Sequence, residues 1–203
     1  SKLDVRNRLG CLYDIMLWPV KNYTARGFLW YQGESNIFNY QFYAPMMTAM
    51  VQLWRNVWEA PDMPFYYVQI APYKYENSSN TGAALLREAQ MEALKTIPNS
   101  GMVPTTDIGD EFCIHPPQKD VVGLRLATLA LTKTYGIRRL PSNGPMMTKV
   151  DYADKKAIVT FDNAPAGLFP TFSELEGFEI AGADKKFYPA KAKIVGRTNT
   201  VEV

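Results

Sequence analysis

The only histidine of the chain, His115, stands where it could act as a general base. It closes the segment DIGDEFCIH (107–115), in which Asp107, Asp110 and Glu111 precede it. A neutral imidazole, with a pKa near ~6.5, can take the proton of a serine hydroxyl, and a nearby carboxylate fixes its tautomer. His115 is therefore a candidate catalytic base, and Asp110, or Glu111 from the same loop, is a candidate for its acid.

A second polar segment, QGESN (32–36), follows an apolar run. The side-chain amides of Gln32 and Asn36 can point N–H donors at a developing oxyanion, and Gly33 allows a tight turn between polar neighbours. A single histidine and a polar turn after a strand are both common in purely structural roles. Neither segment alone identifies an enzyme.

Alternating strand and helix patterns must position these two segments. Continuous apolar runs predict strands, and single apolar stripes with cap residues predict helices between them. The predicted strands are 27–31, 65–70 and 101–104, and the predicted helices begin near Pro45, run from Thr81 to Leu94, and run from Pro117 to Gly136. This order is typical of a parallel sheet, in which the loops after Tyr31, Ile70 and Val103 meet at one edge.

Three strands are few for a sheet covered by helices, because a hydrophobic strand at an open edge promotes aggregation. We infer that further strands come from upstream sequence or from a second chain. After the break PSNGP (141–145), the pattern changes to the strand period, with strands predicted at 156–161 and 190–195 and a turn at 182–184 before a short strand at 187–188. We predict a partial α/β domain over 1–140 and an incomplete β-rich module over 141–203.

Composition excludes several classes of function. The 203 residues carry 22 basic and 20 acidic side chains without a basic run, which argues against nucleic acid as a partner. No apolar stretch approaches the roughly 18 residues that a membrane-spanning helix needs. The two cysteines lack metal-ligand spacing and leave the cellular compartment open. We expect neither a metal nor another cofactor.

Several sequence blocks resemble one enzyme family. The blocks are WYQGESN (30–36), LREAQ (86–90), DIGD (107–110) with IHP (114–116), and VGLRLA (122–127). In this order they are similar to the sialate O-acetylesterase family, within the SGNH superfamily of serine esterases. The tail segments GL (167–168) and GFEIAG (177–182) are similar to the β-module that follows the esterase domain in that family.

The resemblance implies a three-layer α/β fold built on a parallel SGNH-hydrolase-like sheet. It also implies metal-free removal of acetyl groups from O-acetylated carbohydrates through an acyl-serine, in a secreted or periplasmic protein. His115 would be the base, and Gln32 with neighbouring backbone N–H groups would form the oxyanion hole. Glu34, Asn36 and Arg87 would organise the pocket or contact the substrate, although Arg87 could instead pair with Glu34 to tie two loops together.

Two departures from the family pattern affect this interpretation. The family's GQSN-type block with the nucleophilic serine does not occur in residues 1–203, and Ser35 belongs to a different block, so we expect the missing N-terminal segment to supply the nucleophile. Cys113 stands where relatives carry the aspartate of a DIHP sequence, which leaves open Asp110, Glu111 or a Ser–His dyad. The alternative function is a non-catalytic, degenerate esterase-like module that stacks sugars on aromatic loops 37–43 and 72–76.

Overall fold

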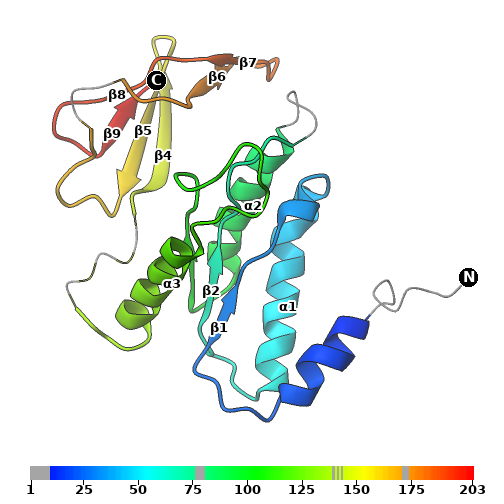
Figure 1. Ribbon diagram of the computed structural model, residues 1–203. Helices are drawn as coiled ribbons and strands as arrows, with labels where there is room; N and C mark the ends of the chain where they lie inside the picture. The colour runs from blue at the N-terminus through cyan, green and yellow to red at the C-terminus, as the bar shows by residue number, and fades with distance from the viewer. Residues whose placement is uncertain (1–9, 76–80, 139, 141, 143, 171–173) are drawn as a thin grey trace, which may run out of the picture. The chain divides into compact units, whose positions relative to one another are not determined.

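The structure is a computed structural model that describes residues 10–75, 81–138, 140, 142, 144–170 and 174–203. It divides into two compact units, Ser1–Leu140 and Pro141–Val203, and each unit is described by itself. The first unit is α/β and the second is built from antiparallel strands (Figure 1). This agrees with the predicted fold class, a partial parallel sheet followed by a small β-rich module.

The first unit contains a parallel sheet in the order β1-β2-β3. The strands are β1 (Phe28–Trp30), β2 (Phe65–Val68) and β3 (Ser100–Val103). In the register, Tyr66 of β2 lies between Leu29 of β1 and Gly101 of β3. All three strands end at the same edge of the sheet, as the sequence predicted, and each is within one or two residues of its predicted bounds.

Helices cover both faces of this sheet. They are α1 (Tyr43–Val57), α2 (Gly82–Thr96) and α3 (Lys119–Lys133). Alternate residues of β2 point to opposite faces: Phe65 and Tyr67 pack with α1 and α2, whereas Tyr66 and Val68 pack with α3. The helices on opposite sides of the strands are visible in Figure 1. The predicted three-layer arrangement is confirmed for these elements.

The ends of α3 differ from the prediction for a physical reason. The helix begins at Lys119, since Pro117 and Gln118 form a turn in which the Lys119 N–H donates to the Pro117 carbonyl at 2.7 Å. Its last residue is Lys133, and Gly136 follows with a positive φ of 69°. The Ile137 N–H then donates to the Leu131 carbonyl at 2.9 Å, which closes the helix end around this glycine. Shorter helical segments of the first unit are Tyr13–Leu17, Trp18–Val20, Glu34–Asn36 and Tyr40–Phe42.

The second unit holds a four-stranded antiparallel sheet in the order β4-β5-β9-β8 and a two-stranded ribbon of β6 and β7. The bounds are β4 (Met146–Ala153), β5 (Lys156–Asp162), β6 (Glu179–Ala181), β7 (Phe187–Pro189), β8 (Lys193–Ile194) and β9 (Thr200–Glu202). The prediction for 156–161 is confirmed, whereas 190–195 shortens to β8. The longest strand, β4, was missed because six of its eight residues are exposed and give little apolar alternation.

The described residues contain no helix long and apolar enough to cross a membrane. Within the same ranges, no cluster of histidine, cysteine and carboxylate side chains has an arrangement that could hold a metal ion.

Candidate active site

A sharp turn after β1 brings the first predicted segment against the core. Gly33 has a φ of +155°, and a Cβ built on it would lie 2.9 Å from Ile70 Cγ2 and 3.2 Å from Gln90 Nε2. The turn continues as a short helical segment, Glu34–Asn36, in which the Asn36 N–H donates to the Gly33 carbonyl at 2.7 Å. Only glycine fits this backbone position without moving the neighbouring side chains.

The Gln32 side chain is held in a fixed orientation. Its Nε2 donates to Asn36 Oδ1 at 2.6 Å, so two predicted site residues are in direct contact. The hydroxyl of Tyr43 donates to the Gln32 carbonyl at 2.8 Å and lies 3.4 Å from Gln32 Oε1. An amide nitrogen carries two N–H groups, and the Asn36 contact uses one of them. The geometry therefore orients an amide donor at the carboxyl edge of the sheet.

A buried glutamine on α2, Gln90, contacts the backbone of this turn. Gln90 Oε1 accepts the Ile70 N–H at 3.0 Å, while Gln90 Nε2 lies 3.3 Å from the Val68 carbonyl and 3.4 Å from the Gln32 carbonyl. The backbone of Gln90 is engaged as well, because its carbonyl accepts the Tyr67 hydroxyl at 2.6 Å. One side chain thus joins the ends of β1 and β2 to α2.

Sequence reasoning did not assign a role to Gln90, and it placed Tyr43 only in the aromatic loop 37–43 of the alternative sugar-binding function. A signal was present for Gln90, since it falls in the inner stripe of α2 between Leu86 and Ala93, where a polar side chain needs buried partners. No signal marked the contact of Tyr43 with the Gln32 turn, because its aromatic ring fits the apolar stripe of α1 as well as any hydrophobic residue.

Glu34 and Arg87 lie close to a group of tyrosines. Burial raises the pKa of the Tyr75 hydroxyl to about 12; the Glu34 carboxylate adds to this shift and the Arg87 guanidinium opposes it. Burial also raises the pKa values of Tyr31 and Tyr43, with a further contribution from Glu34 in each case. The pKa of Arg87 is lowered by burial, against the influence of Tyr75. Both charged residues therefore act on one half-buried region next to the Gln32 turn.

His115 lies in the segment between β3 and α3 and is exposed. Within the described residues, its imidazole makes no hydrogen bond. Asp110 does not contact it: Asp110 Oδ1 accepts the backbone N–H groups of Phe112 at 2.7 Å and Cys113 at 3.0 Å. The Cys113 thiol donates to the His115 carbonyl at 3.1 Å rather than to the ring. The structure thus joins Gln32 to Asn36, but it does not join Asp110 to His115, and the acid assignment stays a prediction.

An apolar pocket of about 380 Å³ lies beside the Gln32 turn. Its lining includes the polar side chains of Gln32, Asn36 and Tyr43, and the apolar side chains of Leu12, Trp30, Met46, Met47 and Met50. The indole N–H of Trp30 is buried and has no hydrogen-bond partner within the described residues. The pocket is therefore lined both by β1, through Trp30, and by the predicted oxyanion donors.

Comparison with known proteins identifies the class. The model of the family described as "Carbohydrate esterase, sialic acid-specific acetylesterase" matches residues 5–132. The chain belongs to this family of carbohydrate esterases, which confirms the resemblance found in the sequence blocks.

Individual relatives agree with this family. The sialate O-acetylesterase of Rattus norvegicus is 30% identical over 170 residues, which cover 74% of this chain and 31% of the relative. The human sialate O-acetylesterase is 29% identical over 165 residues, or 73% of this chain and 32% of the relative. The crystal structure of a carbohydrate acetylesterase from Xanthomonas citri matches with a TM-score of 0.85 and 34% identity, covering 94% of this chain and 44% of that one. This chain therefore spans about one third of the length of these curated relatives.

Proposed function

We propose that this chain is part of a serine-type carbohydrate O-acetylesterase, which removes acetyl groups from sugars and takes its nucleophilic serine from an upstream segment. Membership of the carbohydrate esterase family supports the reaction class. The observation that carries the proposal is the Gln32 amide, fixed by Asn36 and Tyr43 at the carboxyl edge of the sheet from which the His115 segment also departs. Ligands of open α/β sheets bind at this edge.

In the proposed reaction, His115 takes the proton of the upstream serine hydroxyl as its oxygen attacks the acetyl carbonyl. Gln32 donates to the oxyanion of the tetrahedral intermediate, together with neighbouring backbone N–H groups. The intermediate collapses when the sugar hydroxyl leaves with the proton from His115, and an acetyl-serine remains. Water, deprotonated by His115, then releases acetate and restores the serine.

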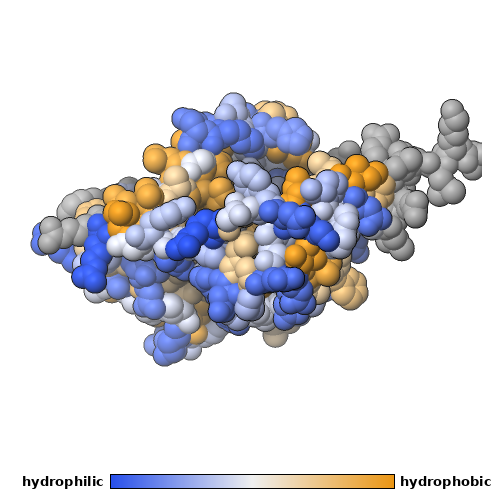
Figure 2. All heavy atoms as spheres, turned by 90° about the horizontal axis from the view of Figure 1, so that it is seen from below, coloured by the Kyte–Doolittle hydropathy of each residue, from blue (hydrophilic) through white to orange (hydrophobic). Residues whose placement is uncertain are grey.

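The upstream segment would dock on the open side of β1. Among the described strands, β1 pairs only with β2, and Leu29 at its centre is 62% exposed. A strand with one unpaired edge can accept a further strand through its backbone N–H and C=O groups. Figure 2 shows hydrophobic patches between hydrophilic ones on one face, and many large hydrophobic side chains besides Leu29 are exposed, so exposure alone does not select this edge. The unpaired backbone of β1, next to the pocket lined by Trp30 and Gln32, supports this edge as the docking site.

The test is hydrolysis of p-nitrophenyl acetate by the 203-residue chain and by a version extended upstream, each compared with its His115→Ala variant. We expect activity only in the extended protein, and its loss in the variant. Activity that survives His115→Ala would assign the base elsewhere. An extended protein that is folded but does not hydrolyse the ester would contradict the esterase proposal.

The second candidate is a non-catalytic sugar-binding module. It is favoured by Cys113, which stands where the family resemblance implies an aspartate. Binding of acetylated sugars by the silent, folded protein, measured by titration calorimetry, would support this reading.

A further inference from the structure

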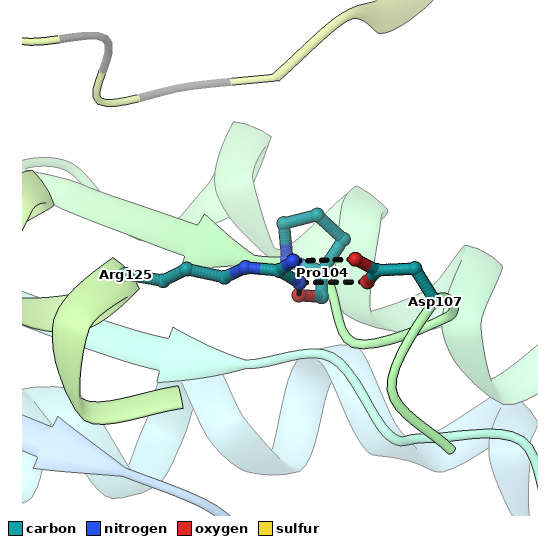
Figure 3. A network of polar contacts seen from close by, with 3 residues as sticks. All are labelled: Pro104, Asp107 and Arg125. Carbon is teal, nitrogen blue, oxygen red and sulfur yellow. Dashed lines mark hydrogen bonds and ion pairs between the residues drawn. The ribbon is translucent and has the colours of Figure 1, made fainter. Parts of the chain in front are cut away.

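Arg125 of α3 holds the turn that follows β3 at two points, as Figure 3 shows. Its Nη1 donates to the Pro104 carbonyl at 2.7 Å and to Asp107 Oδ1 at 2.8 Å, while Nη2 donates to Asp107 Oδ2 at 2.5 Å. The pair is bidentate, and the guanidinium is the less exposed partner, with 28% of its side chain accessible against 59% for Asp107. The hydrogen bonds from Arg125 lower the pKa of the Asp107 carboxyl.

This contact links the two ends of the segment that carries His115. The segment leaves β3 at Pro104, passes through Asp107 and His115, and enters α3 at Lys119. Arg125 lies on the second turn of the same helix. It therefore ties the beginning of the segment to the element that receives its end, and the His115 region lies between these two anchors.

Other contacts fix the first half of the segment but stop short of the histidine. The Thr105 hydroxyl donates to the Gln69 carbonyl at 2.6 Å, and Ile108 is buried against α3. Gly109 approaches Pro72 so closely that a Cβ on it would lie 2.4 Å from Pro72 Cδ. The first half of the segment is therefore anchored at several points, whereas the exposed side chain of His115 makes no hydrogen bond within the described residues.

We propose that Arg125 is a positioning residue for His115, acting through its two-point contact with Pro104 and Asp107. The inference rests on the proposed esterase function. A planar guanidinium can hold a carboxylate and a carbonyl together in one fixed plane, whereas a lysine ammonium supplies the charge without the fork. A positive charge at residue 125 is then not sufficient to position His115, because the planar geometry of the guanidinium sets the position of the catalytic imidazole.

The experiment measures kcat, KM and the pH profile for acetyl ester hydrolysis by the natural protein with its upstream segment. The variants are Arg125→Lys, Asp107→Asn, their double variant, and Glu92→Gln as a control that removes an exposed carboxylate paired with Lys95 on α2. We expect kcat to fall by roughly tenfold to a hundredfold in each single variant, since a misplacement of about 1 Å costs that order of rate. KM and thermal stability should change little, and the double variant should be no slower than the single ones.

A role confined to stability would instead lower the melting temperature and leave kcat and the pH profile unchanged, which would overturn the proposal. So would full activity in Arg125→Lys, because charge would then suffice. His115→Ala separates the two proposals, as its full activity would contradict the esterase mechanism itself.

Alkylation of Cys113 by iodoacetamide, followed by mass spectrometry, gives a readout that needs no activity. This thiol is exposed and donates to the His115 carbonyl, so its reaction rate reports the order of the His115 segment. We expect faster alkylation in Arg125→Lys than in the natural protein and the Glu92→Gln control. Equal rates would overturn the positioning role even in a protein without esterase activity.

Discussion

Gln90→Leu tests whether one buried amide supports the predicted oxyanion turn. Leucine keeps much of the volume of glutamine but removes the acceptor of the buried Ile70 N–H, bonded at 3.0 Å, and the donor that faces the Val68 and Gln32 carbonyls at 3.3 and 3.4 Å. An unsatisfied buried backbone group costs about 1–3 kcal/mol. With one short bond and two longer ones lost, we expect the free energy of unfolding to fall by about 2–3 kcal/mol.

Tryptophan fluorescence in urea is the assay, because all four tryptophans, at positions 18, 30, 54 and 58, belong to the first unit. The signal therefore follows that unit alone, and linear extrapolation gives its free energy of unfolding. The melting temperature should fall by roughly 4–12 °C in a chain of this size. The matched control is Gln52→Leu, the same exchange at an exposed position of α1. Equal stability of the two variants would refute the reasoning, since the Gln90 hydrogen bonds would then contribute nothing.

Three further predictions concern the same region. Gly33→Ala should lower the free energy of unfolding by about 1–3 kcal/mol, measured by the same assay, because the new Cβ would enter the space of Ile70 at a φ of +155°. Asp107→Asn should cost about 0.2–1 kcal/mol at neutral pH. Since Arg125 lowers the pKa of folded Asp107, this contribution is present above the unfolded pKa and is lost as pH falls through the folded value, so the two proteins should converge in acid. Tyr75→Phe should leave stability unchanged or raise it, because that buried hydroxyl has no partner within the described residues, whereas Tyr67→Phe loses a 2.6 Å bond and should cost about 0.5–1.5 kcal/mol.

The layers of the first unit could be predicted from the sequence because local patterns determine them. Continuous apolar runs marked β1, β2 and β3, and the stripe from Met47 to Trp54 marked α1. The parallel order followed from the alternation of strands and helices, and it placed the ends of the three strands at one edge. The second unit was harder, since β4 presents mostly exposed polar residues and β8 has only two residues.

The candidate site was predicted only in part, because its support comes from long-range contacts. The Gln32–Asn36 hydrogen bond joins residues four positions apart in one motif, so a local sequence pattern can indicate it. By contrast, Gln90 reaches the Gln32 carbonyl across 58 positions and Tyr43 reaches it across 11, which no periodicity encodes. Asp110 was chosen as the acid from its spacing to His115, but short polar side chains in turns commonly bond the backbone that follows, as Asp110 does here.

The end of β2 physically connects the two halves of the candidate site. The Ile70 N–H is bound by Gln90, which supports the Gln32 turn on the α1–α2 face of the sheet. The preceding residue, Gln69, accepts the Thr105 hydroxyl at the start of the His115 segment, and its Nε2 donates to the Arg87 carbonyl at 3.0 Å. Both residues are buried, so neither set of contacts can be replaced by water without opening the core. The turn with the proposed oxyanion donor and the start of the segment with the proposed base therefore depend on two consecutive residues at the end of β2, and we expect a shift at Gln69 and Ile70 to displace both.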